Sequence, residues 1–162
     1  MKNSEIYVSH VMSYLIKFRG VSFDFSEAKK FEDWGTLKEW KNIQKQRATF
    51  FLDFDGVLVE NSGQYGAFNW DSPFRPIQDN LNTVRKLFES GATIVITTSR
   101  DASFKNRITS FLKEFGIESS EVICGLNHSP RYLVNDFAPT NSFPTSIAVN
   151  IPRNGTLSDY IE

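Results

Sequence analysis

The stretch Phe50–Val57, with the sequence Phe-Phe-Leu-Asp-Phe-Asp-Gly-Val, decides how the rest of the chain is interpreted. A short apolar, aromatic run that ends at a turn residue predicts a buried β-strand. Asp53 and Asp55 then stand at its carboxyl end, where open α/β folds place their ligands. Because side chains alternate along a strand, both carboxylates point the same way and repel each other. A divalent cation would relieve this, and oxygen ligands favour Mg²⁺. The alternative is an Asp-Gly turn, allowed by Gly56, with both acids solvated.

Composition limits the protein class. The 162 residues suit one domain with a sizeable core, and the net charge is −1. This charge predicts no nucleic-acid partner and no attraction to a membrane surface, and no apolar run is long enough to span a bilayer. We find no signal peptide, and the single Cys124 excludes an internal disulfide. These features favour the cytoplasm.

The order of apolar patterns predicts an α/β fold. Residues 1–46 form an N-terminal helical extension, with a helix over 1–20, a short strand over 21–25 and some helix after Gly35. In residues 47–162, five strands alternate with two helices, which occupy 77–88 and 104–115. The predicted strands are 49–54, 93–98, 121–124, 131–134 and 146–149. This alternation predicts a Rossmann-like three-layer sandwich with a central parallel sheet.

Polar residues follow the later strands as well. Thr98, Ser99 and Arg100 come after the second, Arg131 precedes the fourth, and Asp136 follows it. Hydroxyl groups and a fixed cation suit a phosphoryl group, and a third carboxylate suits a metal site. The alternatives are a helix N-cap at 99–103, a solvated Arg131 and an Asx-turn at Asp136.

Together these motifs resemble the haloacid-dehalogenase (HAD) superfamily of phosphotransferases over roughly residues 47–152. The first motif of that family is a strand that ends in Asp-x-Asp-Gly, and the second is a strand that ends in Thr or Ser. The third is a basic residue, usually Lys, and the fourth is an acidic pair or its equivalent. The matching residues here are Asp53, Asp55 and Gly56, then Thr98, then Arg131, and finally Asn135-Asp136.

The resemblance implies a Mg²⁺-dependent phosphatase. Asp53 would attack phosphorus to form an aspartyl-phosphate, and Asp55 would move the proton. The metal would be held by Asp53, Asp55 and Asp136, while Thr98 and Arg131 would complete the catalytic set. We further expect Gly56, Ser99, Arg100 and Arg75 to bind the substrate.

The connections after the first and second strands leave no room for a large cap domain, so the chain looks like a capless member. Aromatic residues in the first connection form either a pocket wall or a cluster that covers the sheet edge; they are Tyr65, Phe68, Trp70 and Phe74. An open site suits a large substrate or one completed by a neighbouring subunit, which would make the protein a homo-oligomer.

The N-terminal segment is similar to the closing segment of sugar-1-phosphate nucleotidyltransferases, around Trp34-Gly35-Thr36. Its alternative interpretation is an extension that packs on the sheet. We therefore predict a phosphatase that acts on a small phosphorylated metabolite, such as a sugar phosphate of surface-polysaccharide biosynthesis. The alternatives are a non-catalytic module that assembles with a nucleotidyltransferase, and a phosphatase of nucleic-acid ends.

Overall fold

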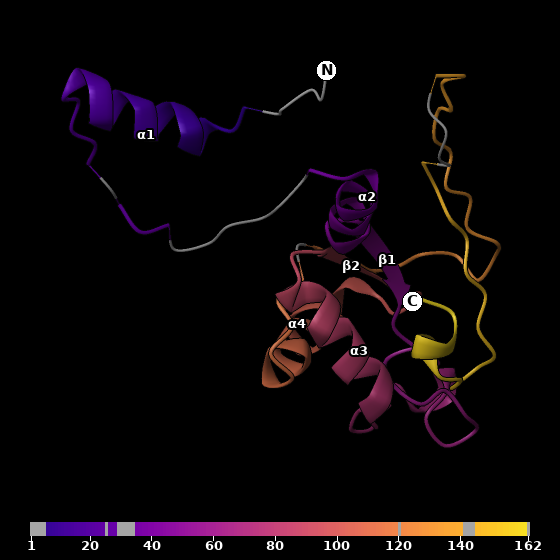
Figure 1. Cartoon of the computed structure of the whole chain (residues 1–162). Helices are drawn as coiled ribbons and strands as arrows, with labels where there is room; N and C mark the ends of the chain where they lie inside the picture. The colour runs from indigo at the N-terminus through magenta and orange to yellow at the C-terminus, as the bar shows by residue number, and fades with distance from the viewer. Residues whose placement is uncertain (1–5, 25, 29–34, 120, 141–144, 162) are drawn as a thin grey trace. The chain divides into compact units, whose positions relative to one another are not determined.

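The computed structural model describes residues 6–24, 26–28, 35–119, 121–140 and 145–161 (Figure 1). The chain divides into two units, residues 1–34 and 35–162. The first unit contains helix α1, Val8–Arg19, which ends at Gly20 in the left-handed conformation with φ of 63°. Helix α2, Leu37–Gln46, belongs to the second unit, although the predicted domain boundary placed it in the N-terminal extension.

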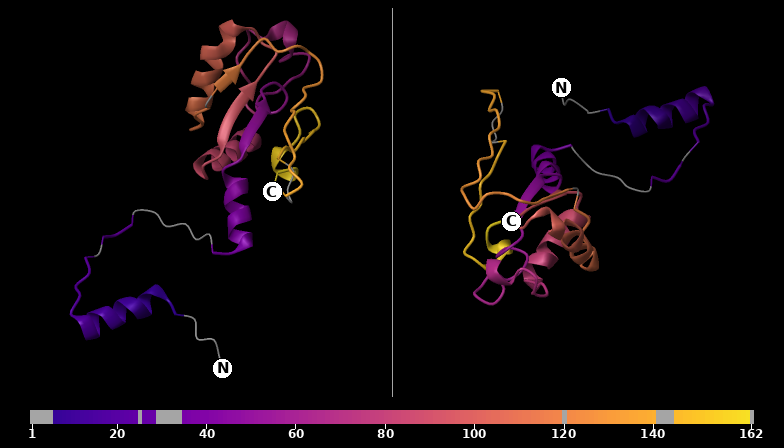
Figure 2. Two further views of the ribbon diagram at one scale, coloured as in Figure 1. Left: turned by 90° about the horizontal axis from the view of Figure 1, so that it is seen from above. Right: turned by 180° about the vertical axis from the view of Figure 1, so that it is seen from behind.

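Three parallel strands form the sheet of the second unit, in the order β1-β2-β3 (Figure 2, left). They are β1 (Thr49–Asp53), β2 (Thr93–Thr97) and β3 (Glu121–Ile123). Asp53 pairs with Thr97, and Thr97 with Ile123, so all three strands end at the same level. The loops that follow them therefore meet at one edge of the sheet, as the α/β prediction requires.

Helices α3 (Gln78–Glu89) and α4 (Lys105–Glu114) connect the strands. Their apolar stripes are buried, with Leu81, Val84, Ile108 and Leu112 at 0% exposure. The connection between β1 and α3 contains only the 3₁₀ helix η1 (Ala67–Asn69), and η2 (Ala102–Phe104) leads into α4. The predicted α/β fold with a central parallel sheet is confirmed.

Three predicted strands are absent. Residues 131–134 and 146–149 are irregular, and so are 21–24, while residue 25 lies outside the described residues. Tyr132, Leu133 and Val134 are 87%, 58% and 89% exposed, so their apolar pattern does not reflect burial. Side-chain bonds link the two C-terminal segments instead, where Thr145 Oγ1 donates to the Asp136 carbonyl at 2.6 Å. A strand requires a neighbouring strand with which its backbone can form hydrogen bonds, and the local sequence pattern does not show whether such a neighbour is present.

The C-terminal residues return to the body of the second unit. The 3₁₀ helix η3, Leu157–Asp159, packs against α3, and the Leu157 side chain is only 4% exposed. Buried Asn80 of α3 fastens this segment, since its Oδ1 accepts from Leu157 N and its Nδ2 donates to the carbonyl oxygens of Val57 and Gly155, each at 2.8 Å. Among the described helices, none is long and apolar enough to cross a membrane.

Candidate active site

Asp53 is the last residue of β1, and its side chain is 37% exposed. Its Oδ1 accepts from the Phe54 backbone N–H at 3.1 Å and from Arg131 Nη2 at 3.3 Å. Burial raises the pKa of Asp53, the Arg131 guanidinium opposes this rise, and the nearby Asp55 adds to it. Asp53 is therefore a carboxylate that faces a cation and remains accessible from solvent. Arg131, predicted as the basic residue of the site, lies beside Asp53, and its role in catalysis stays a prediction.

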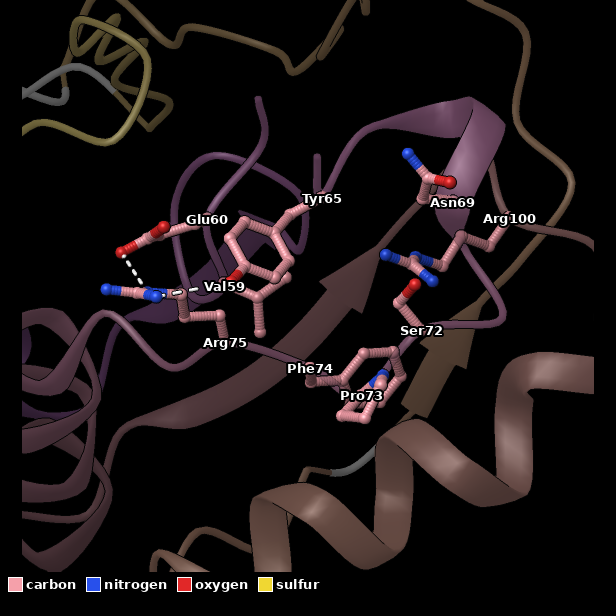
Figure 3. Close-up of a pocket in the computed structure, with 9 residues that line it drawn as sticks. All are labelled: Val59, Glu60, Tyr65, Asn69, Ser72, Pro73, Phe74, Arg75 and Arg100. Atoms are coloured by element: carbon pink, nitrogen blue, oxygen red, sulfur yellow. Dashed lines mark hydrogen bonds and ion pairs between the residues drawn. The ribbon is translucent and has the colours of Figure 1, made fainter. Parts of the chain in front are cut away.

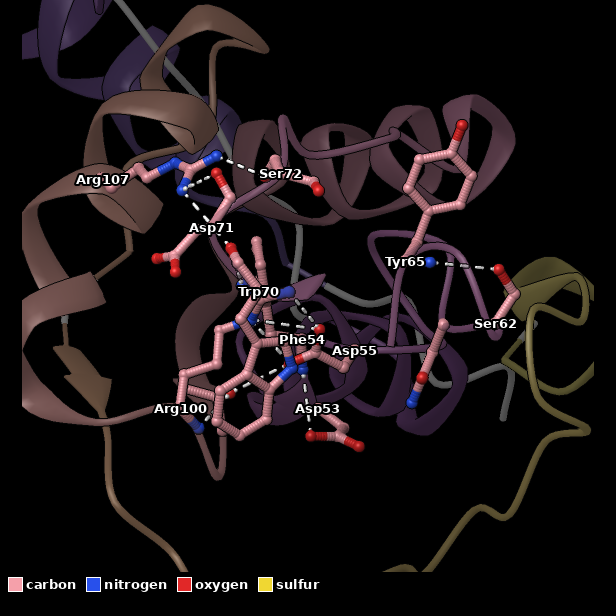
Figure 4. Close-up of polar contacts among 12 residues, drawn as sticks. Asp53, Phe54, Asp55, Ser62, Tyr65, Trp70, Asp71, Ser72, Arg100 and Arg107 are labelled. Carbon is pink, nitrogen blue, oxygen red and sulfur yellow. Dashed lines mark hydrogen bonds and ion pairs between the residues drawn. The ribbon is translucent and has the colours of Figure 1, made fainter. Parts of the chain in front are cut away.

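Asp55 has quite different surroundings. Arg100 donates to both of its carboxylate oxygens, from Nη2 at 2.7 Å and from Nε at 3.0 and 3.1 Å. The Thr98 hydroxyl donates to Asp55 Oδ2 at 3.2 Å. A forked guanidinium fixes both the position and the orientation of a carboxylate. Figure 4 shows Asp55 and Arg100 close to Asp53.

Arg100 lies in the interior, with 2% exposure. Its guanidinium carbon lies 5.0–5.6 Å from the centroids of four aromatic rings, and the rings belong to Phe54, Trp70, Phe74 and Phe104. Its Nη1 donates to the Trp70 carbonyl at 3.0 Å. Aromatic faces stabilise a desolvated cation. We predicted that Arg100 binds substrate, but the structure turns its donors toward Asp55 and the Trp70 loop instead.

Thr98 is also buried, at 0% exposure, and its hydroxyl is occupied within the protein. It donates to Asp55 and accepts from the Arg100 backbone N–H at 3.1 Å. The predicted contact of this hydroxyl with a phosphoryl oxygen would require it to leave Asp55. Ser99, the next residue, is half-buried on the same loop.

Gly56 makes the turn that follows Asp55. Its φ of 89° lies in the left-handed region, and a Cβ there would come within 3.3 Å of Arg153 Cγ. Its N–H donates to the Val59 carbonyl at 2.7 Å, and its carbonyl accepts from Asn154 N at 2.8 Å. Gly56 therefore serves a tight, internally bonded turn, and the predicted role of its N–H in phosphate binding is replaced by the bond to Val59.

Arg75 lies on the other side of the loop, where it lines a small cavity with Glu60 and Tyr65 (Figure 3). Its Nε donates to Glu60 Oε1 at 2.8 Å and its Nη1 donates to Tyr65 Oη at 3.2 Å. The Arg75 side chain is 58% exposed, so part of its positive charge faces solvent.

The predicted metal set is not assembled. Within the described ranges, no group of three or more His, Cys, Asp or Glu side chains lies close enough to hold a metal ion. Asp136 is exposed on the irregular segment after Val134, so its prediction as a third ligand is not met by this arrangement. Asp53 supplies one carboxylate, and the Asp55 carboxylate is engaged by Arg100 and Thr98. These residues fit Mg²⁺ incompletely, because the ion takes octahedral oxygen coordination.

The predicted aromatic cluster separates into two groups. Phe74 is internal, with its ring 5.0 Å from that of Phe54 and 5.3 Å from that of Phe111. Phe68, by contrast, is fully exposed. Trp70 packs edge-on against Phe104 at 6.2 Å and is stacked against His128 at 6.5 Å. Both interpretations apply to Phe74, which packs in the cluster and also lines the small cavity together with Tyr65.

Comparison with known proteins identifies the family. Residues 49–138, more than half of the chain, match the family described as HAD domain in Swiss Army Knife RNA repair proteins. The chain belongs to this family. No curated protein and no solved structure matches it. Membership of this HAD family confirms the superfamily resemblance and indicates a phosphoesterase.

The family description corrects one prediction. We expected no nucleic-acid partner, and that expectation is wrong for a family named after RNA repair proteins. It relied on the net charge of −1, which averages over all 162 residues. Such an average does not describe the charge at one place, and Arg131, whose side chain is 43% exposed, lies beside Asp53. The capless architecture and the nucleotidyltransferase-like N-terminus stay predictions.

The sequence did not indicate the partners of Asp55. Arg100 and Thr98 lie more than 40 positions away, and hydrogen bonding between such distant side chains leaves no periodic signal. The one available signal was an arginine placed directly after a strand that ends in Thr97-Thr98. Asn80 had no signal at all within its helical stripe.

Proposed function

We propose that this HAD domain is a phosphomonoester hydrolase that removes a terminal phosphate from RNA. The observation that carries the proposal is the unequal pair of aspartates at the end of β1. Asp53 is accessible and faces Arg131, while Asp55 is held in a fixed orientation by Arg100 and Thr98. The family description supports RNA as the substrate class.

In the proposed reaction, an Asp53 oxygen attacks phosphorus, and the bond from phosphorus to the ester oxygen breaks. For this step Asp55 must carry a proton, which it gives to the leaving alkoxide of the ribose. The carboxylate that results is the form that Arg100 and Thr98 hold in the structure. Water then attacks the aspartyl-phosphate, and Asp55 takes back a proton, which releases inorganic phosphate and restores Asp53. The fixed orientation of Asp55 suits a group that must both give and receive a proton at one place.

Arg131 offsets negative charge during this reaction. Its guanidinium already lies 3.3 Å from Asp53 Oδ1, so an incoming phosphate meets a cation beside the nucleophile. Mg²⁺, if bound by Asp53 and the Asp55 backbone carbonyl, would supply further charge screening. We propose no step that depends on the ion, because the described side chains supply too few ligands.

The test uses a short oligoribonucleotide with a terminal phosphate, assayed for phosphate release with Mg²⁺ and with EDTA. Asp53→Asn should reduce release by roughly 10⁴-fold or more, since it removes the nucleophile. Asp79→Asn, an exposed carboxylate in the first turn of α3, is the matched control and should retain activity. Unchanged hydrolysis by Asp53→Asn, or no hydrolysis of any phosphomonoester by the unmodified chain, would overturn the proposal.

A further inference from the structure

Two aromatic rings face each other beside the aspartate pair. The Trp70 and His128 rings are inclined by only 18°, and their centroids are 6.5 Å apart. Trp70 lies on the loop after β1, and His128 lies on the loop after β3. Since the strands end at the same level, both rings belong to the sheet edge that carries Asp53.

Their separation lies at the wide end of the range for aromatic pairs in contact, whose ring centroids are about 4.5–7 Å apart. Carbon atoms of stacked rings rest about 3.5–4 Å apart, so a ring placed between two others separates them by about 7 Å. The observed centroid distance of 6.5 Å is shorter than that spacing, so a base would enter with a small displacement of the exposed His128. The near-parallel planes present two aromatic faces to a flat ligand, whereas an edge-on pair would present one.

The Trp70 side of this pair is held firmly. Its ring packs edge-on against Phe104, and the Arg100 guanidinium carbon lies 5.3 Å from the ring centroid. Its carbonyl accepts from Arg100 Nη1 at 3.0 Å and from Arg107 Nη1 at 3.4 Å. A wall that is fixed before binding lowers the entropy cost of binding.

The loop that carries His128 is hydrogen-bonded to the backbone of the same arginine, Arg100. Gly125 N donates to the Arg100 carbonyl at 2.7 Å, and Leu126 N donates to the Thr98 carbonyl at 3.1 Å. These bonds anchor the start of the loop, while His128 itself is exposed. Three residues further on, Arg131 reaches Asp53. One loop therefore carries an aromatic ring and a cation to the nucleophile.

We propose that Trp70 and His128 form a clamp that stacks on both faces of a nucleobase next to the phosphate bound at Asp53. The inference rests on the proposed function, because it assumes a nucleic-acid end as the substrate. Every base offers a π face, so the clamp would accept single-stranded ends with little sequence preference. Arg131 is placed to meet the phosphate of the same nucleotide.

The first experiment measures binding without turnover. In the Asp53→Asn chain, Trp34→Phe and Trp40→Phe leave Trp70 as the only tryptophan. A short single-stranded oligoribonucleotide should quench Trp70 fluorescence. A counterpart of equal length and charge that lacks the terminal base should bind about 5- to 150-fold more weakly, the usual range for one stacked base. Equal dissociation constants for the two oligonucleotides would overturn the clamp.

The second experiment tests the exposed wall. His128→Ala should remove most of the preference for the base-containing oligonucleotide, and His128→Phe should keep it because the flat ring is preserved. Tyr160→Ala, another exposed aromatic residue, is the matched control and should keep the preference. A preference that survives His128→Ala, or that is lost in Tyr160→Ala to the same degree, contradicts the inference.

These outcomes separate the two proposals. Base-dependent quenching in a chain that hydrolyses no phosphomonoester supports the clamp and overturns the phosphatase. Hydrolysis that is equally efficient with the base-containing and base-free ends, together with equal binding, supports the phosphatase and overturns the clamp.

Discussion

Asp53 and Asp55 are chemically identical and only two positions apart, but their surroundings give them different properties. Asp53 is partly desolvated beside a single exposed arginine, and its pKa is raised. Asp55 receives a forked guanidinium and a hydroxyl. This difference originates in residues far away in the sequence, and it is the exposure of Asp53, rather than its pKa, that supports its proposed role as the nucleophile.

Asp53 should reduce the stability of the folded protein at neutral pH. Folding raises its pKa above the ordinary 3.8, so holding it ionised has a cost that is present above the folded pKa and disappears below pH 3.8. Asp53→Asn should therefore increase Tm at pH 7, even though the same change should abolish the proposed hydrolysis. The increase should shrink as the pH falls toward 3.8. Thermal unfolding followed by circular dichroism over this pH range measures it, and a lower Tm at pH 7 would contradict it.

Asp101 provides a control for which the effect of the carboxylate on stability has the opposite sign. Hydrogen bonds from the Ser103 hydroxyl and backbone N–H lower its pKa below 3.8. Its stabilising effect is therefore present above 3.8 and lost as the pH falls through the folded pKa. Asp101→Ala should lower Tm at pH 7, and this loss should diminish in acid.

Arg100 should be needed for both stability and activity. Arg100→Ala leaves Asp55, whose side chain is only 13% exposed, without its main partner, and breaking a buried pair in this way costs about 3–5 kcal/mol. Arg100→Lys keeps the charge but loses the fork, so we expect an intermediate loss of stability and of hydrolysis. Urea unfolding and phosphate release measure both effects.

Arg85→Ala, from an exposed i,i+4 pair with Glu89, should change stability by less than about 0.5 kcal/mol. Equal effects at Arg100 and Arg85 would contradict this.

At the scale of elements, the sequence predicts what local pattern determines. β1, α3, β2, α4 and β3 were all predicted, because each has a periodic apolar side that burial requires. Residues 131–134 have the same apolar character but no partner strand, so the strand predicted from their pattern is absent. The candidate site shows the same division between what local pattern predicts and what tertiary contacts decide. Asp53 and Arg131 were predicted together, but the partners of Asp55 and the position of Asp136 depend on tertiary contacts.

Asn80 should be the most sensitive polar residue of α3. It has 0% exposure, and its amide serves three backbone groups, in the loop after Asp55 and around η3. Asn80→Ala would leave these buried groups without partners and should cost about 2–3 kcal/mol. Asn82→Ala, two positions along the same helix, should cost much less, because its bond with Gln78 lies at the surface. Chemical denaturation of the two variants decides this, and similar midpoints would refute it.

At the scale of the whole molecule, the C-terminal residues support the site although they lie beyond the range 49–138 that matches the HAD family. Asn154 N donates to the Gly56 carbonyl, and Asn154 Oδ1 accepts from Asn61 N at 2.8 Å. These bonds fix both sides of the turn that follows Asp55. Residues 1–34, in contrast, form a separate unit.

Removal of either end of the chain should therefore have different effects. Deleting residues 152–162 removes the buried Leu157 and two of the partners of Asn80, which should cost at least about 3 kcal/mol. Hydrolysis should fall with stability, since the turn at Gly56 loses the Asn154 bond. Deleting residues 1–34 should leave both the midpoint of unfolding and the rate of phosphate release of the remaining unit near those of the full chain. If the C-terminal deletion were silent while the N-terminal deletion abolished hydrolysis, the site would depend on residues 1–34, and the support that we assign to Asn80 and Asn154 would be wrong.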